Sequence, residues 1–204
     1  MNKGKNKYKN WNEGEIMKKI MTITDWVHSV LASSIEEGDF CIDATAGKGK
    51  DTLFLAEQVG QKGKVLAFDI QKDAIDQAQK LICEKGYENL VEFHLCGHEH
   101  MDEYAEAESA SVILFNLGYL PGGDHALATK ESTTLEAAKK GLSILKKQGV
   151  MCICIYSGGD SGFSEKEAVL AWAKELPAKE FDVISCPFIN KPNNPPLPVF
   201  IRKR

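Results

Sequence analysis

The residues with the clearest chemistry lie in one short segment, residues 43–51 (DATAGKGKD), which directly follows an apolar run of strand length. Gly47 and Gly49 accept the positive backbone angles of a tight turn and let a ligand approach the main chain. A helix that starts beyond the turn offers unpaired N–H groups in its first turn. The segment therefore predicts a turn that holds a nucleotide or a nucleoside against the backbone.

A second acidic residue, Asp69, lies 20 residues after Gly49, at the end of the next apolar run. In a chain of alternating strands and helices, this position accepts hydrogen bonds from ribose hydroxyls, which favours a free ribose over a phosphorylated one. The dinucleotide pattern GxGxxG fails because its third position, counted from Gly47, is Thr52. The Walker A pattern fails because no glycine lies at the required spacing upstream. An acidic residue at the end of the first strand suits the positive ammonium and sulfonium groups of S-adenosylmethionine, which is the predicted cofactor.

Strands that alternate with helices must position these residues. Apolar runs of strand length, rich in Val, Ile and Phe, occur at residues 40–44, 65–70, 91–95, 112–117, 150–156, 181–188 and 199–201. Segments with helical spacing occur at residues 16–33, 51–59, 73–84, 132–145 and 164–176. Strands that alternate with helices and are buried on both sides predict an α/β fold, in which a mostly parallel sheet carries helices on both faces.

The last two predicted strands are connected differently from the others. Residues 187–198 between them contain five prolines and leave no room for a crossover helix, so these strands should pair antiparallel as a hairpin. A seven-stranded, mostly parallel sheet that ends in an antiparallel hairpin is the strand plan of the Rossmann-like class I methyltransferase fold.

Length and composition fit one folded domain. The chain has 204 residues, 43% of them hydrophobic and 26% charged, which is ordinary globular usage. We expect a basic tail over residues 1–16 and a single domain over residues 17–204. The net charge of −4 argues against a protein that coats nucleic acid through bulk charge. No apolar run approaches the roughly 20 residues that span a bilayer, and the six cysteines form no CxxC pair, so we expect a cytoplasmic protein without membrane or metal.

With these residues in place, the sequence resembles a bacterial family of class I methyltransferases that were once described as putative rRNA methylases and are assigned to tRNA wobble-uridine modification. The similarity covers residues 18–203. It is carried by residues 43–52 (DATAGKGKDT), 67–71 (AFDIQ), His98, 115–124 (FNLGYLPGGD), 132–133 (ST) and 188–196 (FINKPNNPP). The resemblance implies conversion of 5-aminomethyl(-2-thio)uridine to 5-methylaminomethyl(-2-thio)uridine, with S-adenosylmethionine as cofactor and the anticodon stem-loop of tRNA as partner.

By that resemblance, the turn at residues 47–51 holds the methionyl part of the cofactor, Asp69 and Gln71 hold the ribose, and Gly97 and His98 flank the adenine. The predicted cofactor-binding residues are Asp43, Gly47, Lys48, Gly49, Asp51, Asp69, Gln71, Gly97 and His98.

The chain departs from the family pattern in two places. Gly97 stands where the family usually has a small polar residue, which weakens the expected adenine contact. Ser157 and Gly159 stand where the family commonly has two histidines near the substrate entrance, so no role of those imidazoles carries over.

Residues 116–121 (NLGYLP), at the end of the fourth predicted strand, resemble the [Asn/Asp]-Pro-Pro-[Tyr/Phe] element of amino-methyltransferases with two positions changed. In an in-line methyl transfer, the amine lone pair faces the sulfonium methyl, so the N–H groups need acceptors on the other side. The Asn116 amide oxygen and the two backbone carbonyls that follow it are the predicted acceptors. Asp124 is the candidate that steers or deprotonates the ammonium, against a loop-capping role. Tyr119 is the candidate that stacks on or hydrogen-bonds the uracil, against plain packing.

Other functions stay open at this point. A methyltransferase for another RNA or for a small-molecule amine would need the same turn, and a non-catalytic nucleotide-binding or RNA-binding module would keep the same fold. For RNA contact, Lys191 in the proline-rich loop is the leading candidate among lysines that are otherwise solvated charges. The spacing of His94, His98 and His100 suggests a metal site, but His94 lies within a strand run and His98 opens the next segment, so we expect none. A homodimer is compatible with the sequence.

Overall fold

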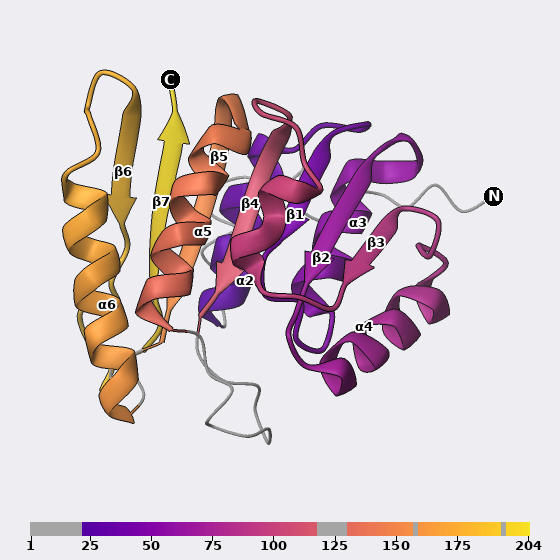
Figure 1. Cartoon of the computed structure of the whole chain (residues 1–204), viewed down its shortest axis with the longest axis horizontal. Helices are drawn as coiled ribbons and strands as arrows, with labels where there is room; N and C mark the ends of the chain where they lie inside the picture. Colours follow the sequence, from indigo (N-terminus) through magenta and orange to yellow (C-terminus); the bar gives the residue numbers. More distant parts are fainter. Residues whose placement is uncertain (1–21, 118–129, 157–158, 193–194) are drawn as a thin grey trace.

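The computed structural model describes residues 22–117, 130–156, 159–192 and 195–204, with residues 159–163 described by their backbone alone (Figure 1). Within these ranges, seven strands form one sheet in the order β3-β2-β1-β4-β5-β7-β6. Strands β1 to β5 pair in parallel, and β7 runs antiparallel to both β5 and β6. The predicted mostly parallel sheet with an antiparallel C-terminal hairpin is therefore confirmed. The predicted basic tail, residues 1–16, lies outside the described residues.

The strands alternate with helices as the apolar pattern predicts. The strands are β1 (Phe40–Asp43), β2 (Lys64–Phe68), β3 (Val91–His94), β4 (Ala110–Asn116), β5 (Leu145–Ile155), β6 (Phe181–Ser185) and β7 (Leu197–Lys203). The α-helices in the described part are α2 (Ile23–Leu31), α3 (Lys50–Val59), α4 (Lys72–Lys85), α5 (Glu131–Ile144) and α6 (Gly159–Lys174). Short 3-10 helices are η1 (Ala32–Ser34), η2 (Gly60–Lys62) and η3 (His98–Glu103).

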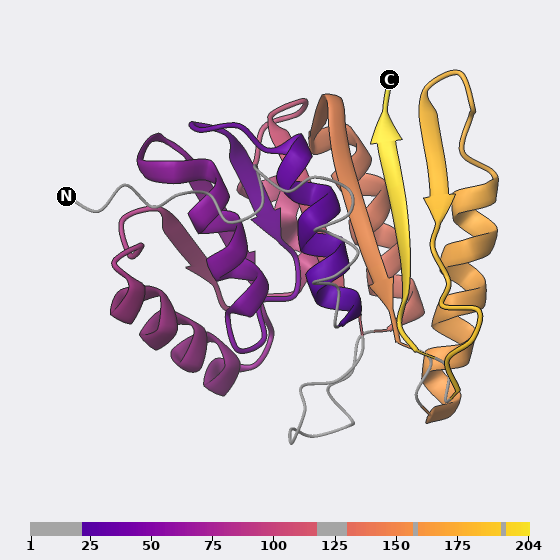
Figure 2. The same ribbon diagram turned by 180° about the vertical axis from the view of Figure 1, so that it is seen from behind.

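Helices cover both faces of the sheet. Figure 1 shows α5 and α6 in front of the strands, and the reverse view shows α2 and α3 on the opposite face (Figure 2). The alternation along β4 matches these two layers, because Ile113 and Phe115 pack in the core on the α5 side, whereas Val112 and Leu114 pack against α2 and α3. A strand buried on both faces is therefore apolar at nearly every position, which is why β4 is easily recognised as a strand in the sequence.

The predicted leading helix over residues 16–33 is wrong in its extent. Helix α2 begins at Ile23, because Thr22 has extended backbone angles and caps the helix. The Thr22 hydroxyl accepts a hydrogen bond from the Asp25 N–H at 3.1 Å, and the Asp25 carboxylate accepts one from the Thr22 N–H at 3.2 Å. This reciprocal capping box satisfies two N–H groups that a continuous helix would bond otherwise.

Strand ends also differ from the predicted limits. Strand β6 ends at Ser185 rather than at residue 188, and β7 begins at Leu197 rather than at residue 199. Strand β5 begins at Leu145, five residues earlier than expected, and its pairing with β4 contains an irregularity beside Val112. Gln148 there has a φ of 65°, which apolar patterning does not reveal.

Candidate functional site

The segment 43–51 lies at the carboxyl edge of the sheet, directly after β1, and Asp43 is its buried anchor. The Asp43 carboxylate is fully buried, and it accepts hydrogen bonds from the Thr45 N–H at 3.1 Å and from the Thr52 hydroxyl at 2.6 Å. Burial, followed by the neighbouring charge of Asp51, raises the pKa of Asp43 to about 7. The carboxyl at the base of the turn therefore changes its protonation state near neutral pH.

The two glycines of the turn occupy positions that few other residues can take. Gly47 has a φ of 50°, and Gly49, with a φ of 80°, is the N-cap of α3. A Cβ atom at Gly49 would lie 2.8 Å from the Ala78 Cα of α4, so the turn packs directly against that helix. Lys48 between them is exposed. No side chain at Gly47 or Gly49 therefore stands in front of the first turn of α3, which presents its unpaired N–H groups.

Asp69 joins this turn to the end of β2. One carboxylate oxygen accepts the Gly47 N–H at 2.9 Å, and the other accepts the Gln71 N–H at 2.9 Å. Gln71 in turn is the N-cap of α4. Each carboxylate oxygen retains a second lone pair, so Asp69 can accept further hydrogen bonds from a ligand. The turn and the end of β2 are therefore joined by a direct hydrogen bond between residues that are 22 positions apart in the sequence.

His98 lies behind the turn, in the first position of η3, where Gly97 is the N-cap. Its ring is 7% exposed, and Nδ1 lies 3.2 Å from the Ala44 carbonyl oxygen. A carbonyl only accepts, so Nδ1 carries the proton and donates. Nε2 is buried and has no hydrogen-bond partner in the described part of the chain, and burial lowers the pKa of the ring. His98 is therefore a neutral imidazole with a free acceptor.

Asn116, the last residue of β4, is bound to this turn through its backbone N–H and its side-chain NH₂ group. Its backbone N–H donates to the Thr45 hydroxyl at 2.6 Å, and its side-chain NH₂ donates to Asp51 Oδ2 at 3.0 Å. The amide oxygen is buried and has no hydrogen-bond partner among the described residues. A buried acceptor without a partner is costly, which marks this atom as a place where a ligand N–H belongs.

The side chains of Asp51 and Tyr156 both contact the side chain of Asn116. The other oxygen of Asp51, Oδ1, lies 2.7 Å from His28 Nε2 in α2. Tyr156, just after β5, has polar contacts with the side chains of Asn116 and Thr24, but burial and the neighbouring Cys154 and Asp51 raise its pKa to about 12. Its hydroxyl therefore stays protonated at neutral pH.

Most of the predicted site residues gather at one edge, whereas others lie outside the described residues. The turn, Asp69, Gln71, His98 and Asn116 meet at the carboxyl ends of β1, β2 and β4, while Tyr119 and Asp124 fall in residues that the structure does not describe. The roles of all these residues remain predictions.

Sequence reasoning missed three side chains of this site. Thr45 and Thr52 lie inside the 43–52 motif and could have been found as hydroxyl donors and acceptors for its acidic residues. His28 left no local signal, because its partner Asp51 is 23 residues away on another helix.

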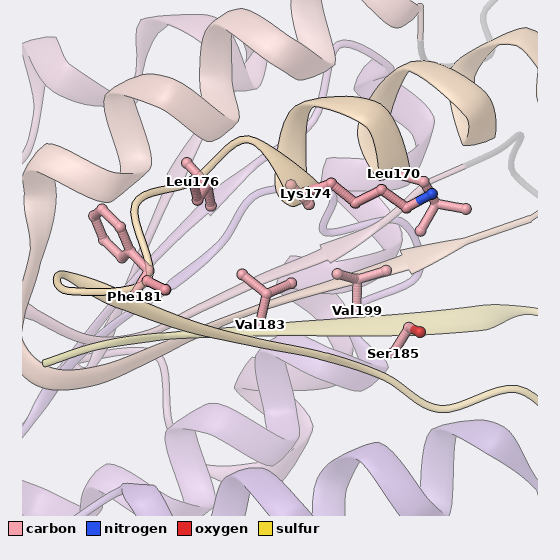
Figure 3. A pocket seen from close by; sticks show the side chains of 9 residues that line it. Leu170, Lys174, Leu176, Phe181, Val183, Ser185 and Val199 are labelled. Carbon is pink, nitrogen blue, oxygen red and sulfur yellow. The ribbon is translucent and has the colours of Figure 1, made fainter.

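The described residues also contain a separate pocket, but they show no metal site and no membrane-spanning helix. A pocket of about 350 Å³ between α6 and the β6–β7 strands is lined mainly by apolar side chains and shares no residue with the turn (Figure 3). No group of three or more His, Cys, Asp or Glu side chains is placed to hold a metal ion in residues 22–117, 130–156, 159–192 and 195–204. Over the same ranges, no helix has the length and apolar character that crossing a membrane requires.

Comparisons with known proteins show which family the chain belongs to. A family model described as "Putative rRNA methylase" matches residues 65–202. Over 191 residues, the chain is 38% identical to the chloroplastic tRNA (mnm(5)s(2)U34)-methyltransferase of Arabidopsis thaliana, which covers 89% of this chain and 69% of the relative. The chain belongs to this methylase family.

Solved structures of relatives confirm the class I methyltransferase fold. A putative rRNA-methylase from Clostridium thermocellum, 40% identical, superposes with a TM-score of 0.88 over 91% of this chain and 99% of its own. A putative methyltransferase from Streptococcus mutans, solved in complex with SAH, is 34% identical, with a TM-score of 0.81 over 89% of this chain and 97% of its own. The edge that carries Asp43, Asp69 and Asn116 therefore belongs to a methyltransferase.

Proposed function

We propose that the protein is an S-adenosylmethionine-dependent N-methyltransferase that converts 5-aminomethyl(-2-thio)uridine to 5-methylaminomethyl(-2-thio)uridine at the wobble position of tRNA. The observation that carries the proposal is the buried, unpartnered amide oxygen of Asn116 at the end of β4. An amine substrate has N–H groups to donate to this oxygen, whereas a methyl-accepting carbon atom has no such donor. The plant relative, whose name specifies the mnm(5)s(2)U34 position, supports tRNA as the substrate.

The residues of the turn fit the proposed cofactor. The absence of a side chain at Gly47, which is only half-buried, leaves the main chain of the turn accessible to an adenosyl ligand, and Asp69 has lone pairs left for ribose hydroxyls. The free Nε2 acceptor of His98 fits the amino group of an adenine. The relative solved with SAH supports the same class of ligand. When bound, the cofactor supplies a methyl group on a positively charged sulfur, and the negative charge of Asp43 favours that ligand.

The chain's own contribution to the reaction is mainly orientation. The Asn116 oxygen accepts an N–H of the neutral amine, which turns the nitrogen lone pair toward the methyl donor. The NH₂ group of Asn116 cannot take this place, because it already donates to Asp51. The proposed roles of Asp124 in removing the proton of the ammonium and of Tyr119 in holding the uracil complete the site.

Methylation of defined tRNA pools tests the proposal. The purified protein, given S-adenosylmethionine, should methylate tRNA from a strain that lacks the gene, and nucleoside mass spectrometry should find 5-methylaminomethyluridine or its 2-thio form. tRNA from the intact strain should accept little, because its wobble uridine is already modified. Equal labelling of both pools would overturn the wobble assignment.

The family description names rRNA, so ribosomal RNA is the second candidate substrate. The same assay should include rRNA from the deletion strain as a separate pool. Preferential labelling of rRNA would identify rRNA as the substrate in place of tRNA. Labelling of neither RNA would favour a small-molecule amine as the substrate, or a non-catalytic binding module.

Calorimetry tests the cofactor assignment separately from the substrate. Asp69→Ala should weaken S-adenosylmethionine binding at least about tenfold, since it removes the carboxylate that holds both the turn and the proposed ribose contact. Asp76→Ala is the matched control, because Asp76 is an exposed carboxylate in α4 that pairs with Lys72 on the same helix. An Asp69→Ala protein with wild-type affinity would refute the assigned ribose site.

A further inference from the structure

Helix α2 reaches the proposed methyl-acceptor site through one buried side chain, His28. His28 is 7% exposed, and its ring stacks on Phe54 with centroids 3.9 Å apart and planes 5° from parallel. Its Nε2 atom lies 2.7 Å from Asp51 Oδ1, while Asp51 Oδ2 accepts the Asn116 NH₂ at 3.0 Å. Asp51 itself is 8% exposed. Three side chains from α2, α3 and β4 thus form one continuous chain of contacts.

We propose that His28 is a positioning residue for methyl transfer, which acts through Asp51 to hold the Asn116 amide in the one orientation that presents its oxygen. The inference rests on the proposed function, since it assigns the Asn116 oxygen to an amine substrate. It gives Asp51 a role in orienting the acceptor amine, and it makes α2 part of the active site.

The Asn116 carboxamide is nearly symmetric in shape but not in its hydrogen bonding. Rotation of the Asn116 side chain by half a turn exchanges an acceptor oxygen for an NH₂ donor at almost the same place. With the NH₂ group outward, the amine would meet a donor, and its lone pair would turn away from the methyl group. Asp51 prevents this rotation, because a carboxylate only accepts and therefore requires the NH₂ group on its own side.

Asp51 can hold the Asn116 NH₂ group in place only if its own carboxylate is fixed by a second contact. Its carboxylate follows the Gly49 N-cap, where the chain has just left a tight turn, and a free carboxylate would rotate about its own side-chain bonds. The contact with His28 occupies the oxygen that does not face Asn116, and the Phe54 ring holds the imidazole flat. The carboxylate is therefore held from both sides.

A second contact from α2 reaches the same amide. Thr24 lies four residues before His28 in α2, so the two side chains share one face of the helix. The Tyr156 hydroxyl has polar contacts with Thr24 and with Asn116. Helix α2 is thus linked to the Asn116 side chain through Tyr156 as well as through Asp51.

A double-mutant cycle separates this positioning role from a merely structural one. His28→Phe keeps a flat ring on Phe54 but removes the contact with Asp51, and it should lower kcat about tenfold or more while the affinity for S-adenosylmethionine changes less than about twofold. In an Asn116→Ala background, the same substitution should cost no further kcat, because there is no amide left to orient. His28→Gln, whose amide can still donate to Asp51, should restore most of the activity.

His94→Phe is the matched control for the ring substitution. His94 is also largely buried and stacks on a phenylalanine, Phe68, at 4.9 Å, and the other contacts of its ring within the described residues are with Glu92 and Tyr104. We expect wild-type kcat from this variant. If His28→Phe fails to fold, His28→Asn, whose shorter amide does not reach Asp51, replaces it with the same expectations.

An NMR measurement on the full-length protein tests the inference without any substrate. The side-chain NH₂ resonances of Asn116, assigned by their loss in Asn116→Ala, should move and exchange faster with water in His28→Phe. An unchanged Asn116 amide would overturn the positioning role, and so would additive losses of kcat in the cycle. An inactive wild-type protein on every RNA pool would instead refute the proposed function, and the amide measurement would still decide the role of His28.

Discussion

Replacing Asp43 by asparagine should make the cofactor-free protein more stable, and increasingly so as the pH rises. Asp43 is fully buried, and its two oxygens accept the Thr45 N–H and the Thr52 hydroxyl. Asparagine can keep both contacts, since its oxygen accepts the N–H and its NH₂ group donates to the hydroxyl, which is free to rotate. The substitution therefore removes the ionisation with little change in shape.

The size of the effect follows from the pKa of Asp43, which moves from 3.8 to about 7 on folding. This is a shift of about 3 units, and each unit corresponds to 1.36 kcal/mol, so the limit is about 4 kcal/mol. Between these two pH values, the folded state holds a proton that the unfolded state has released. The stability from this group is therefore fully present below pH 3.8 and is lost as the pH rises through about 7.

Urea unfolding of both proteins over the range from about pH 4.5 to pH 8.5 measures this difference. The free energy of unfolding of Asp43→Asn should exceed that of the wild type by only about 1 kcal/mol at pH 4.5, and by about 4 kcal/mol at pH 8.5. Groups that titrate in both proteins cancel in the comparison.

Asp39→Asn provides a control of opposite sign. Burial acts to raise the pKa of Asp39, but the Lys146 ammonium at 2.7 Å and the Glu36 N–H outweigh it, so the pKa is lowered. This carboxylate stabilises the fold above its unfolded pKa, and the contribution is lost as the pH falls. Asp39→Asn should therefore be less stable than wild type at neutral pH, with a difference that shrinks toward acid. A pH-independent difference for Asp43→Asn would refute the reasoning.

Three further expectations concern the turn, the cofactor and the RNA. Gly49→Ala should lower the free energy of unfolding by about 2 kcal/mol or more, since its Cβ meets the backbone of α4, whereas Gly86→Ala, with a φ of 76° and open space around it, should cost only about 1 kcal/mol in urea unfolding. By calorimetry, affinity for S-adenosylmethionine should rise from pH 6 to pH 8 in the wild type, as Asp43 loses its proton, and stay flat in Asp43→Asn. Lys191→Glu should raise KM for tRNA about tenfold at low salt with little change in kcat, and a KM that does not respond would exclude this lysine from RNA contact.

Local sequence patterns determined a large part of this protein. Gly47 and Gly49 specify the turn because only glycine takes such backbone angles without strain, and alternating apolar runs specify strands and helices because each must bury one or both faces. The position of Asp69 follows from the same periodicity, since parallel strands end at one edge. The capping box of Thr22 and Asp25 was equally local, and attention to it would have placed the start of α2 correctly.

The tertiary structure alone decided how these groups are charged and oriented. The pKa of Asp43 near 7 depends on complete burial and on Asp51 nearby, and neither can be deduced from spacing. The free oxygen of Asn116 exists because Asp51, 65 residues earlier, holds the NH₂ group, and Asp51 is held by His28 from a helix that precedes the sheet. Patterns along the chain constrain dihedral angles and buried faces, but ionisation and side-chain rotation respond to neighbours through space, and packing alone brings those neighbours together.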